Sequence, residues 1–259
     1  MTEGTEDIEI IEEALLNSMP ALQTVLLDGW ILRFSRGYTY RANCVCPLLY
    51  SGSGDAGAKI RLCERLFDAN GIPPVFKVTA ILQKGLAGLL LSRGYRDVKT
   101  VFAMRCPLES PAAPGAAEIE CTSAPDEQWL EASCRLTGVT APGLAEVHRR
   151  CVQDLAVAGI FVKAAVDGRT VGCGYGTAER GYAGVYDLHV DEAYRRRGIG
   201  TDICRAVLRF GREQGARYGY LIVDSRNRNA ISLYSGMGFS PLYEYRFYCR
   251  EGPYFITDA

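Results

Sequence analysis

The second half of this chain repeats the first half. A shift of 144 positions places Gly94-Tyr95 on Gly238-Phe239 and Gly71 on Gly215, without a gap over about 60 positions. The shift also superimposes three further pairs of segments: the helical runs after Gly57 and Thr201, Phe76–Val78 on Tyr220–Ile222, and Asn43–Cys46 on Asp187–Val190. We therefore interpret the first half as a diverged copy of the second half.

A glycine turn stands out in the second copy. Residues Arg195–Gly200 read Arg-Arg-Arg-Gly-Ile-Gly and lie between the strand-like run Val185–Val190 and the helix-like run Thr201–Gln214. Two glycines in a tight turn at a helix start allow successive backbone N–H groups to point at one anion. The helix dipole and the arginines add positive potential, which suits a diphosphate. The turn lacks the Gly-Lys-Ser/Thr of a Walker loop and the third glycine of a dinucleotide fingerprint.

The first copy differs from the second at this turn. Residues Ser51–Ala56 fall on the glycine turn and keep its small residues, but the arginines are absent and Asp55 is present. An aspartate repels a diphosphate. We therefore predict that the first copy has lost this ligand and that one ligand binds per chain. We also expect the first copy to lack the opening strand and helices of a complete unit.

The second copy shows strand and helix patterns in a defined order. The expected helices are Asp126–Leu136, Leu144–Ala156 and Asn229–Ser235, and the expected strands are Phe161–Val166, Val171–Thr177, Tyr220–Val223 and Tyr243–Cys249. Hairpins come first, as at Asp167-Gly168, and crossover helices follow, which predicts an α/β (α+β) fold with a mixed central sheet and helices on both faces. Pro107–Ala117 is a predicted linker between domains 1–110 and 118–259.

Composition excludes several classes of protein. The net charge is −1, which favours neither nucleic acid nor an anionic membrane, and no apolar run approaches the ~20 residues that span a bilayer. The acidic segment Met1–Glu13 has no secretory signal pattern. The ten cysteines are scattered without a Cys-x-x-Cys, and the chain has two histidines. We therefore expect a cytoplasmic protein with buried free thiols and no metal site.

Three ordered features of the second copy resemble the GNAT superfamily of acyl-CoA N-acyltransferases. The first is Leu188-His189-Val190 followed by Arg195-x-x-Gly198-x-Gly200, which is similar to the signature Q/R-x-x-G-x-G/A of that superfamily. The second is Asn227-x-x-Ala230-x-x-x-Tyr234, and the third is Gly238-Phe239. The resemblance implies a GNAT-like fold over Ile119–Glu251. The first copy resembles the smaller, degenerate partner found in tandem members of the superfamily.

The resemblance also implies a binding site for acetyl-CoA. In the superfamily the sheet splays after this strand, and the pantetheine arm pairs with the exposed backbone, here that of Leu188 and Val190. Asn227 would touch the pantetheine or cap the following helix. Tyr234, with a usual pKa near 10, would protonate the departing thiolate. The implied acetyl-CoA-binding residues are Leu188, His189, Val190, Arg195, Arg196, Arg197, Gly198, Ile199, Gly200, Thr201, Asn227 and Ala230.

The general base is the least defined residue of the expected site. Many GNAT enzymes carry a glutamate six residues before the final valine of the strand, where this chain has Gly184. Side chains alternate along a strand, so Asp187 and His189 share one face, and a bulge could re-aim Asp187. We predict that Asp187 is the catalytic base and that His189 is structural. Glu244 and a water chain are the alternatives.

The first copy carries a polar and aromatic cluster on its expected strands: Trp30, Arg33, Arg41 and Asn43. Such residues can be ordinary sheet packing. They can also form one wall of an acceptor pocket, because binding sites are common at the junction of two packed domains.

Together these patterns predict an acetyl-CoA-dependent N-acetyltransferase in which an amine attacks the thioester directly within a ternary complex. The alternative is a non-catalytic acyl-CoA-binding or sensing protein, because the glutamate is missing at position 184. The expected partner is a small-molecule or peptide amine. We expect no nucleic acid or membrane partner, and a monomer or homodimer.

Overall fold

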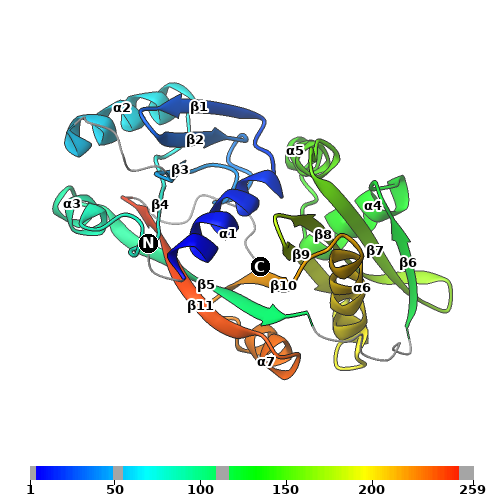
Figure 1. The fold of residues 1–259 in the computed structure, drawn as a ribbon. Helices are drawn as coiled ribbons and strands as arrows, with labels where there is room; N and C mark the ends of the chain where they lie inside the picture. The colour runs from blue at the N-terminus through cyan, green and yellow to red at the C-terminus, as the bar shows by residue number, and fades with distance from the viewer. Residues whose placement is uncertain (1–3, 49–54, 109–116, 251–259) are drawn as a thin grey trace.

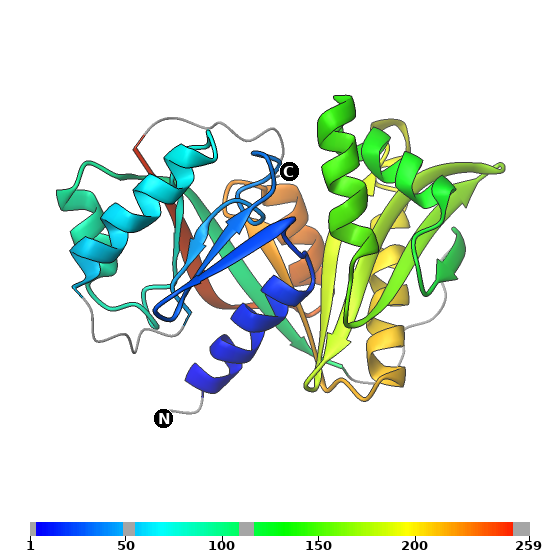
Figure 2. The same ribbon diagram turned by 90° about the horizontal axis from the view of Figure 1, so that it is seen from above.

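The computed structural model describes residues 4–48, 55–108 and 117–250 (Figures 1 and 2). The first copy contains α1 (Thr5–Asn17), β1 (Gln23–Leu27), β2 (Trp30–Phe34), β3 (Val45–Cys46), α2 (Ala56–Ala69), β4 (Phe76–Val78), α3 (Leu86–Ser92) and β5 (Arg96–Pro107). The second copy contains β6 (Glu118–Thr122), α4 (Glu127–Thr137), α5 (Pro142–Gln153), β7 (Ala158–Val166), β8 (Arg169–Glu179), β9 (Tyr182–Val190), η1 (Glu192–Tyr194), α6 (Ile199–Glu213), β10 (Tyr218–Asp224), α7 (Arg228–Gly236) and β11 (Ser240–Cys249).

The strands of the described residues form one mixed sheet in the order β1-β2-β3-β4-β11-β5-β10-β9-β8-β7-β6. The pairs β3–β4 and β9–β10 are parallel. The hairpin at Asp167-Gly168 forms as predicted, and both residues have the positive φ of a type I′ turn, at 50° and 74°. The predicted α/β (α+β) class with a mixed central sheet is confirmed.

The internal repeat is a repeat of fold. From β1 to β5 and from β7 to β11, the elements follow one order of three strands, a helix, a strand, a helix and a strand. The counterparts of β1 to β5 are β7 to β11, in that order, and β6 has none. Exchanging the counterparts reverses the order of these ten strands in the sheet, so an approximate two-fold axis passes between β5 and β11. The predicted tandem arrangement is confirmed.

The last strand of each copy lies in the other copy. β5 pairs with β10 of the second copy, with Val101 opposite Asp224, and β11 pairs with β4 of the first copy, with Phe247 opposite Lys77. The two exchanged strands also pair with each other. The predicted domains 1–110 and 118–259 therefore share one continuous sheet. Most of the predicted linker, residues 109–116, lies outside the described residues.

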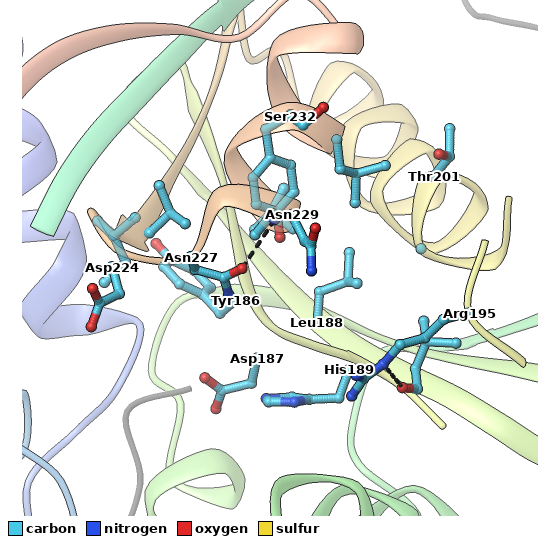
Figure 3. Close-up of a pocket in the computed structure, with 18 of the residues that line it drawn as sticks. Tyr186, Asp187, Leu188, His189, Arg195, Thr201, Asp224, Asn227, Asn229 and Ser232 are labelled. Atoms are coloured by element: carbon cyan, nitrogen blue, oxygen red, sulfur yellow. Dashed lines mark hydrogen bonds between the residues drawn. The ribbon is translucent and has the colours of Figure 1, made fainter. Parts of the chain in front are cut away.

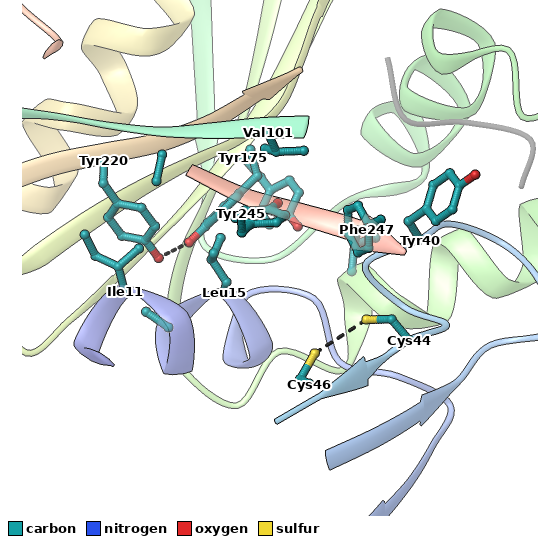
Figure 4. Packing of buried hydrophobic residues seen from close by; sticks show 14 of the residues in the cluster. Ile11, Leu15, Tyr40, Cys44, Cys46, Val101, Tyr175, Tyr220, Tyr245 and Phe247 are labelled. Carbon is teal, nitrogen blue, oxygen red and sulfur yellow. Dashed lines mark hydrogen bonds between the residues drawn. The ribbon is translucent and has the colours of Figure 1, made fainter. Parts of the chain in front are cut away.

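Helix α1 joins the copies beneath the centre of the sheet. Its residues Ile11 and Leu15 are buried against Tyr175 and Tyr220 of the second copy (Figure 4). Its Glu12 accepts hydrogen bonds of 2.7 Å from Lys77 of the first copy and Tyr243 of β11. The expectation that the first copy lacks the opening strand and helices is wrong for one helix, α1, whereas no strand precedes β1 among the described residues. The helix is stable there because its apolar face is covered by both copies.

The opposite faces of the second copy's sheet are covered by different helices. A Cβ atom at Gly176 would meet Val207 of α6 at under 3.0 Å, so glycine on β8 allows α6 to pack closely on this face. On the other face Trp129 of α4 packs against Tyr175, and its indole N–H points at the carbonyl oxygens of Val162 and Gly174, each at 3.2 Å. The predicted placement of helices on both faces is confirmed.

The ten cysteines are all free thiols, and most are buried. Within the described ranges, no group of three or more His, Cys, Asp or Glu side chains could hold a metal ion. Nor does the described part of the chain contain a helix with the length and apolar character needed to cross a membrane.

Candidate active site

The sheet opens at the carboxyl end of the parallel pair β9–β10. Their pairing ends at Val185 opposite Leu221, although both strands continue, to Val190 and Asp224 respectively. Beyond this point a cavity of about 810 Å³ lies between the strands. Because the strands diverge, the backbone of β9 beyond Val185 has no β10 partner and can pair with an extended ligand.

The predicted glycine turn forms one wall of this cavity. Gly198 is the N-cap of α6 with φ of 84°, and Arg196 also has a positive φ of 64°. Gly198 has no side chain to cap the helix, so the first N–H groups of α6 face the open end of the turn. Alternating backbone conformations of this kind form an anion-binding concavity.

Most of the predicted site residues line this one cavity. Those that do are Asp187, Leu188, His189, Val190, Arg195, Arg196, Gly198, Ile199, Gly200, Thr201, Asn227, Ala230 and Tyr234 (Figure 3). Arg197 does not line it. Its guanidinium lies over the ring of Tyr194 and donates to the carbonyl oxygen of Ala193 at 3.2 Å.

Asn227 and Tyr234 reach the cavity from α7. Asn227 is the N-cap residue of this helix, and Tyr234 lies within it. The side-chain oxygen of Asn227 accepts a hydrogen bond of 3.1 Å from the N–H of Ala230, so Asn227 caps α7 as one prediction had it. Tyr234 is largely buried against Phe239. Burial, with a smaller contribution from Cys204, raises the pKa of the Tyr234 phenol, so this phenol stays protonated at neutral pH.

A β-bulge re-aims Asp187. Residues Asp187 and Leu188 together oppose Gly174 of β8, and Asp187 has a φ of 44°. Its carboxylate accepts a hydrogen bond of 2.9 Å from Arg41 of the first copy. Burial alone would raise the pKa of Asp187, but the charge of Arg41, with those of His148 and His189, holds this pKa below its usual value. The bulge therefore places a carboxylate that stays ionised beside the cavity.

A second cation from the first copy faces Asp224 at the end of β10. Lys99 of β5 lies 3.6 Å from the Asp224 carboxylate, which also binds Arg226 at 2.8 Å. Both Lys99 and Arg41 line the cavity. The first copy therefore supplies one wall of the cavity. Of the polar and aromatic cluster that could form such a wall, Arg41 is the member that lines it.

The other members of that cluster are structural. Trp30 is buried against Phe76, Arg33 donates to the carbonyl oxygen of Arg41 at 2.7 Å, and Asn43 accepts from the N–H of Ser35 at 2.7 Å. Arg33 thereby positions the backbone of Arg41. For these three residues, ordinary packing is the correct interpretation.

Within the described residues, the equivalent cleft of the first copy is closed by a glutamine. Gln83, which the repeat places on Asn227, is buried between the ends of β3 and β4. It accepts a hydrogen bond of 2.7 Å from the N–H of Thr79 and donates one of 3.0 Å to the carbonyl oxygen of Pro47. Asp55 caps α2 through the N–H of Gly57. The rest of the aligned turn, residues 51–54, lies outside the described residues.

Several lining residues were not predicted from the sequence, namely Lys99, Val101, Asp224, Tyr245 and Phe247. Lys99 and Val101 lie on β5, and Tyr245 and Phe247 lie on β11. The alternation of side chains along β5 and β11 predicts that these residues lie in strands, but it does not predict that they line a cavity. The strand exchange between the copies brings them to the cavity.

Comparisons with known proteins agree with this architecture. A sequence model of the family described as "Probable histone acetyltransferase Rv0428c C-terminal" matches residues 5–248. An uncharacterized N-acetyltransferase of Bacillus subtilis (strain 168), YobR, is 26% identical over 246 residues, which are 93% of this chain and 98% of that protein.

Solved structures share the fold. A GCN5-related N-acetyltransferase from Kribbella flavida superposes with a TM-score of 0.67 at 16% identity, over 97% of each chain. A tandem GNAT protein from the clavulanic acid biosynthesis pathway superposes with a TM-score of 0.61 at 15% identity, over 81% of this chain and 74% of that one. The family match spans both copies and the splayed strands. The chain therefore belongs to the family of that sequence model and, with it, to the GNAT superfamily of N-acetyltransferases.

Proposed function

We propose that this protein transfers an acetyl group from acetyl-CoA to a primary amine by direct attack within a ternary complex. The observation that carries the proposal is the cavity at the β9–β10 splay, which contains the glycine turn at one end and Tyr234 on its wall. Membership of a family described as acetyltransferases supports the transferred group.

The donor would lie along β9 and across the start of α6. The backbone of Leu188 and Val190, which has no β10 partner, would pair with the pantetheine amides, in place of the 3.1 Å hydrogen bond that the Val190 carbonyl accepts from Arg195. The turn from Arg195 to Gly200 would hold the diphosphate. Leu188 and Val190 direct their side chains at α6, because a Cβ atom at Gly200 would lie 3.4 Å from Leu188 Cδ2 and 3.8 Å from Val190 Cγ2. Their side chains thus support the helix that the donor crosses.

The acceptor would enter from the side formed by the first copy. This side of the cavity carries charges of both signs, from Arg41, Lys99, Asp187 and Asp224. It also carries aromatic surface, from Tyr245 and Phe247. Such a surface fits a polar amine. Holding both substrates in one cavity would contribute much of the rate through proximity.

In the reaction, the amine nitrogen attacks the thioester carbon, the C–S bond breaks, and the thiolate takes the proton of Tyr234. A phenol that stays protonated at neutral pH suits this role. The cavity lining in the described part of the chain includes no cysteine, which favours direct attack over an acyl-cysteine intermediate.

The alternative function is binding or sensing of acyl-CoA without turnover. The observation that favours it is Gly184, where a Cβ atom would lie under 3.0 Å from the phenol of Tyr186. The catalytic glutamate of many GNAT enzymes would not fit at this position without moving Tyr186. Tyr234 favours the enzyme, because a binder has no use for a proton donor near the sulfur.

The test combines two assays on the purified full chain. Thiol release from acetyl-CoA is followed across a panel of amino acids, polyamines, aminoglycosides and lysine-containing peptides, and calorimetry measures acetyl-CoA binding. We expect turnover with at least one amine and one acetyl-CoA per chain. Tight acetyl-CoA binding without turnover of any amine would favour the sensor. Two acetyl-CoA per chain would contradict the closed cleft of the first copy.

A further inference from the structure

The amine must lose a proton as the amide forms. Many GNAT enzymes carry a glutamate as the proton acceptor where this chain has Gly184, and here the ring of Tyr186 fills the space beside Gly184. The ring of Tyr186 folds back over Gly184, and its hydroxyl is hydrogen-bonded to that of Tyr220. Burial raises the pKa of the Tyr186 phenol, so it is not a proton acceptor at neutral pH. The other titratable residues of the cavity are therefore the candidates for a protein base.

The carboxylates near the cavity are poorly suited to this role. Glu244 lies outside the cavity and binds Arg246 at 2.8 Å. Asp224 is paired with Lys99 and Arg226, and its pKa is lowered by those hydrogen bonds and charges despite burial. Asp187 is paired with Arg41, and its pKa is likewise below the usual value. A carboxylate with a lowered pKa binds a proton weakly at neutral pH.

His189 remains, and its position meets the requirement. Because Leu188 and Val190 face α6, the intervening His189 faces the other side of the strand, where Asp187 and Arg41 lie. Figure 3 shows its imidazole beside the carboxylate of Asp187, and both residues line the cavity. Within the described part of the chain, no hydrogen bond engages the imidazole of His189. By contrast, the other histidine, His148, is fully buried and hydrogen-bonded through both ring nitrogens.

We propose that His189 is the catalytic base that takes the proton of the attacking amine, and that Asp187, held by Arg41, positions its imidazole. This proposal rests on the proposed acetyltransferase function. The amine forms the C–N bond and gives a proton to the imidazole, the C–S electron pair goes to sulfur, and the sulfur takes the Tyr234 proton. The imidazolium then returns its proton to the Tyr234 phenolate through solvent, which restores both residues.

The charges around His189 set the pH at which the base is active. Burial lowers the pKa of His189 from 6.5, and Arg195 and Arg41 lower it further, while Asp187 raises it. His148, on α5, faces the same group of charges. The imidazole is therefore neutral and able to accept a proton at pH 7. Turnover should fall on the acidic side of a pKa below 6.5, where His189 becomes protonated.

The first experiment measures kcat with a saturating amine as a function of pH. H189Q should lose ~10²–10⁴-fold in kcat and lose the acidic limb. D187N should retain more activity than H189Q and move the limb to lower pH, because it removes the charge that raises the pKa of His189. R41Q should move the limb to higher pH, because it removes a charge that lowers this pKa.

The matched control is H148Q, which changes the only other histidine and lies outside the cavity. It should retain the acidic limb. Proton NMR of the two histidine rings gives a second measurement that requires no active variant. The kinetic pKa of the wild type should equal the pKa of the His189 ring, assigned by comparison with H148Q.

The proposal is overturned if H189Q turns over like the wild type, or if D187N loses more activity than H189Q. It is also overturned if the kinetic pKa matches neither histidine ring. These outcomes all require an active wild type. Failure of the wild type to acetylate any amine would instead contradict the proposed function itself.

Discussion

At the scale of single residues, two carboxylates that line the cavity are paired with cations from the opposite copy. Asp187 and Asp224 belong to the second copy, whereas the cations that bind them, Arg41 and Lys99, belong to the first. Each pair is largely buried, and breaking such a pair leaves an uncompensated charge. The first copy thus supplies two cations to the cavity of the second copy.

Tyr234 provides a test of the proton donor at this scale. Tyr234→Phe removes one hydroxyl, so folding and acetyl-CoA binding should survive. We expect kcat to fall by ~10²–10⁴-fold with a modest change in the KM for acetyl-CoA, because the hydroxyl acts mainly in the transition state. Steady-state thiol release beside calorimetry measures both quantities.

Tyr186→Phe is the control for that substitution. It removes a buried hydroxyl that is hydrogen-bonded to the hydroxyl of Tyr220, and should cost about 0.5–1.5 kcal/mol of stability. Its turnover should remain close to that of the wild type. Equal turnover in both variants would remove Tyr234 from the mechanism.

At the scale of elements, the start of α6 is where we propose that the donor binds. The helix begins at a glycine with positive φ and packs closely on the glycines of β8, so its N-terminus is held at the mouth of the splay. The bulge in β9 acts in the same region by turning Asp187 out of the regular alternation.

Gly198→Val tests the turn. The backbone at φ of 84° resists a β-branched residue, although no atom lies within 4 Å of the added Cβ. We expect loss of acetyl-CoA affinity, measured by calorimetry, while the fold persists. Gly215→Val is the control, because Gly215 follows α6 with φ of 83° and equally open space. It should destabilise the protein to a similar extent and keep the affinity. Equal affinities in both variants would mean that the turn is only a structural corner.

At the scale of the whole molecule, the two copies form one folding unit. The exchange of β5 and β11 means that neither copy has a complete sheet alone, and α1 covers strands of the other copy. His148 adds a polar junction, since its ring is hydrogen-bonded to Tyr38 of the first copy at 2.5 Å and to Ser133 of α4 at 2.8 Å. We infer that the copies unfold together.

The junction at His148 predicts how stability depends on pH. Burial lowers the pKa of His148 in the folded protein below the usual 6.5, although Asp187 opposes this shift. The unfolded state therefore binds more protons as pH falls. The stabilisation from a neutral His148 is present above about pH 6.5 and is lost progressively below it.

The measurement is denaturant unfolding of the wild type and H148Q between pH 7.5 and 5.5. H148Q should be less stable at pH 7.5 and should lose less stability as the pH falls. H189Q serves as the comparison that retains the His148 contribution. A pH dependence in H148Q equal to that of the wild type would show that His148 does not titrate in this range.

The local patterns of the sequence were sufficient to predict the tandem α/β fold and many of the residues that line the cavity around the glycine turn. Hairpin turns, helix periodicity and the glycine turn arise from interactions between residues close in sequence, so they can be predicted from sequence alone. The same shift of 144 positions that revealed the repeat also aligned β5 with β11.

Only the tertiary structure supplies the observations on which the proposed acceptor side and the proposed base depend. The pairing of Asp187 with Arg41, the closure of the first cleft by Gln83, and the position of Tyr186 over Gly184 depend on where separate segments meet. Strand alternation assigns a side chain to a face but does not identify the segment that covers that face. Arg41 and Asp187 are 146 residues apart, and their contact changes which residue can accept a proton.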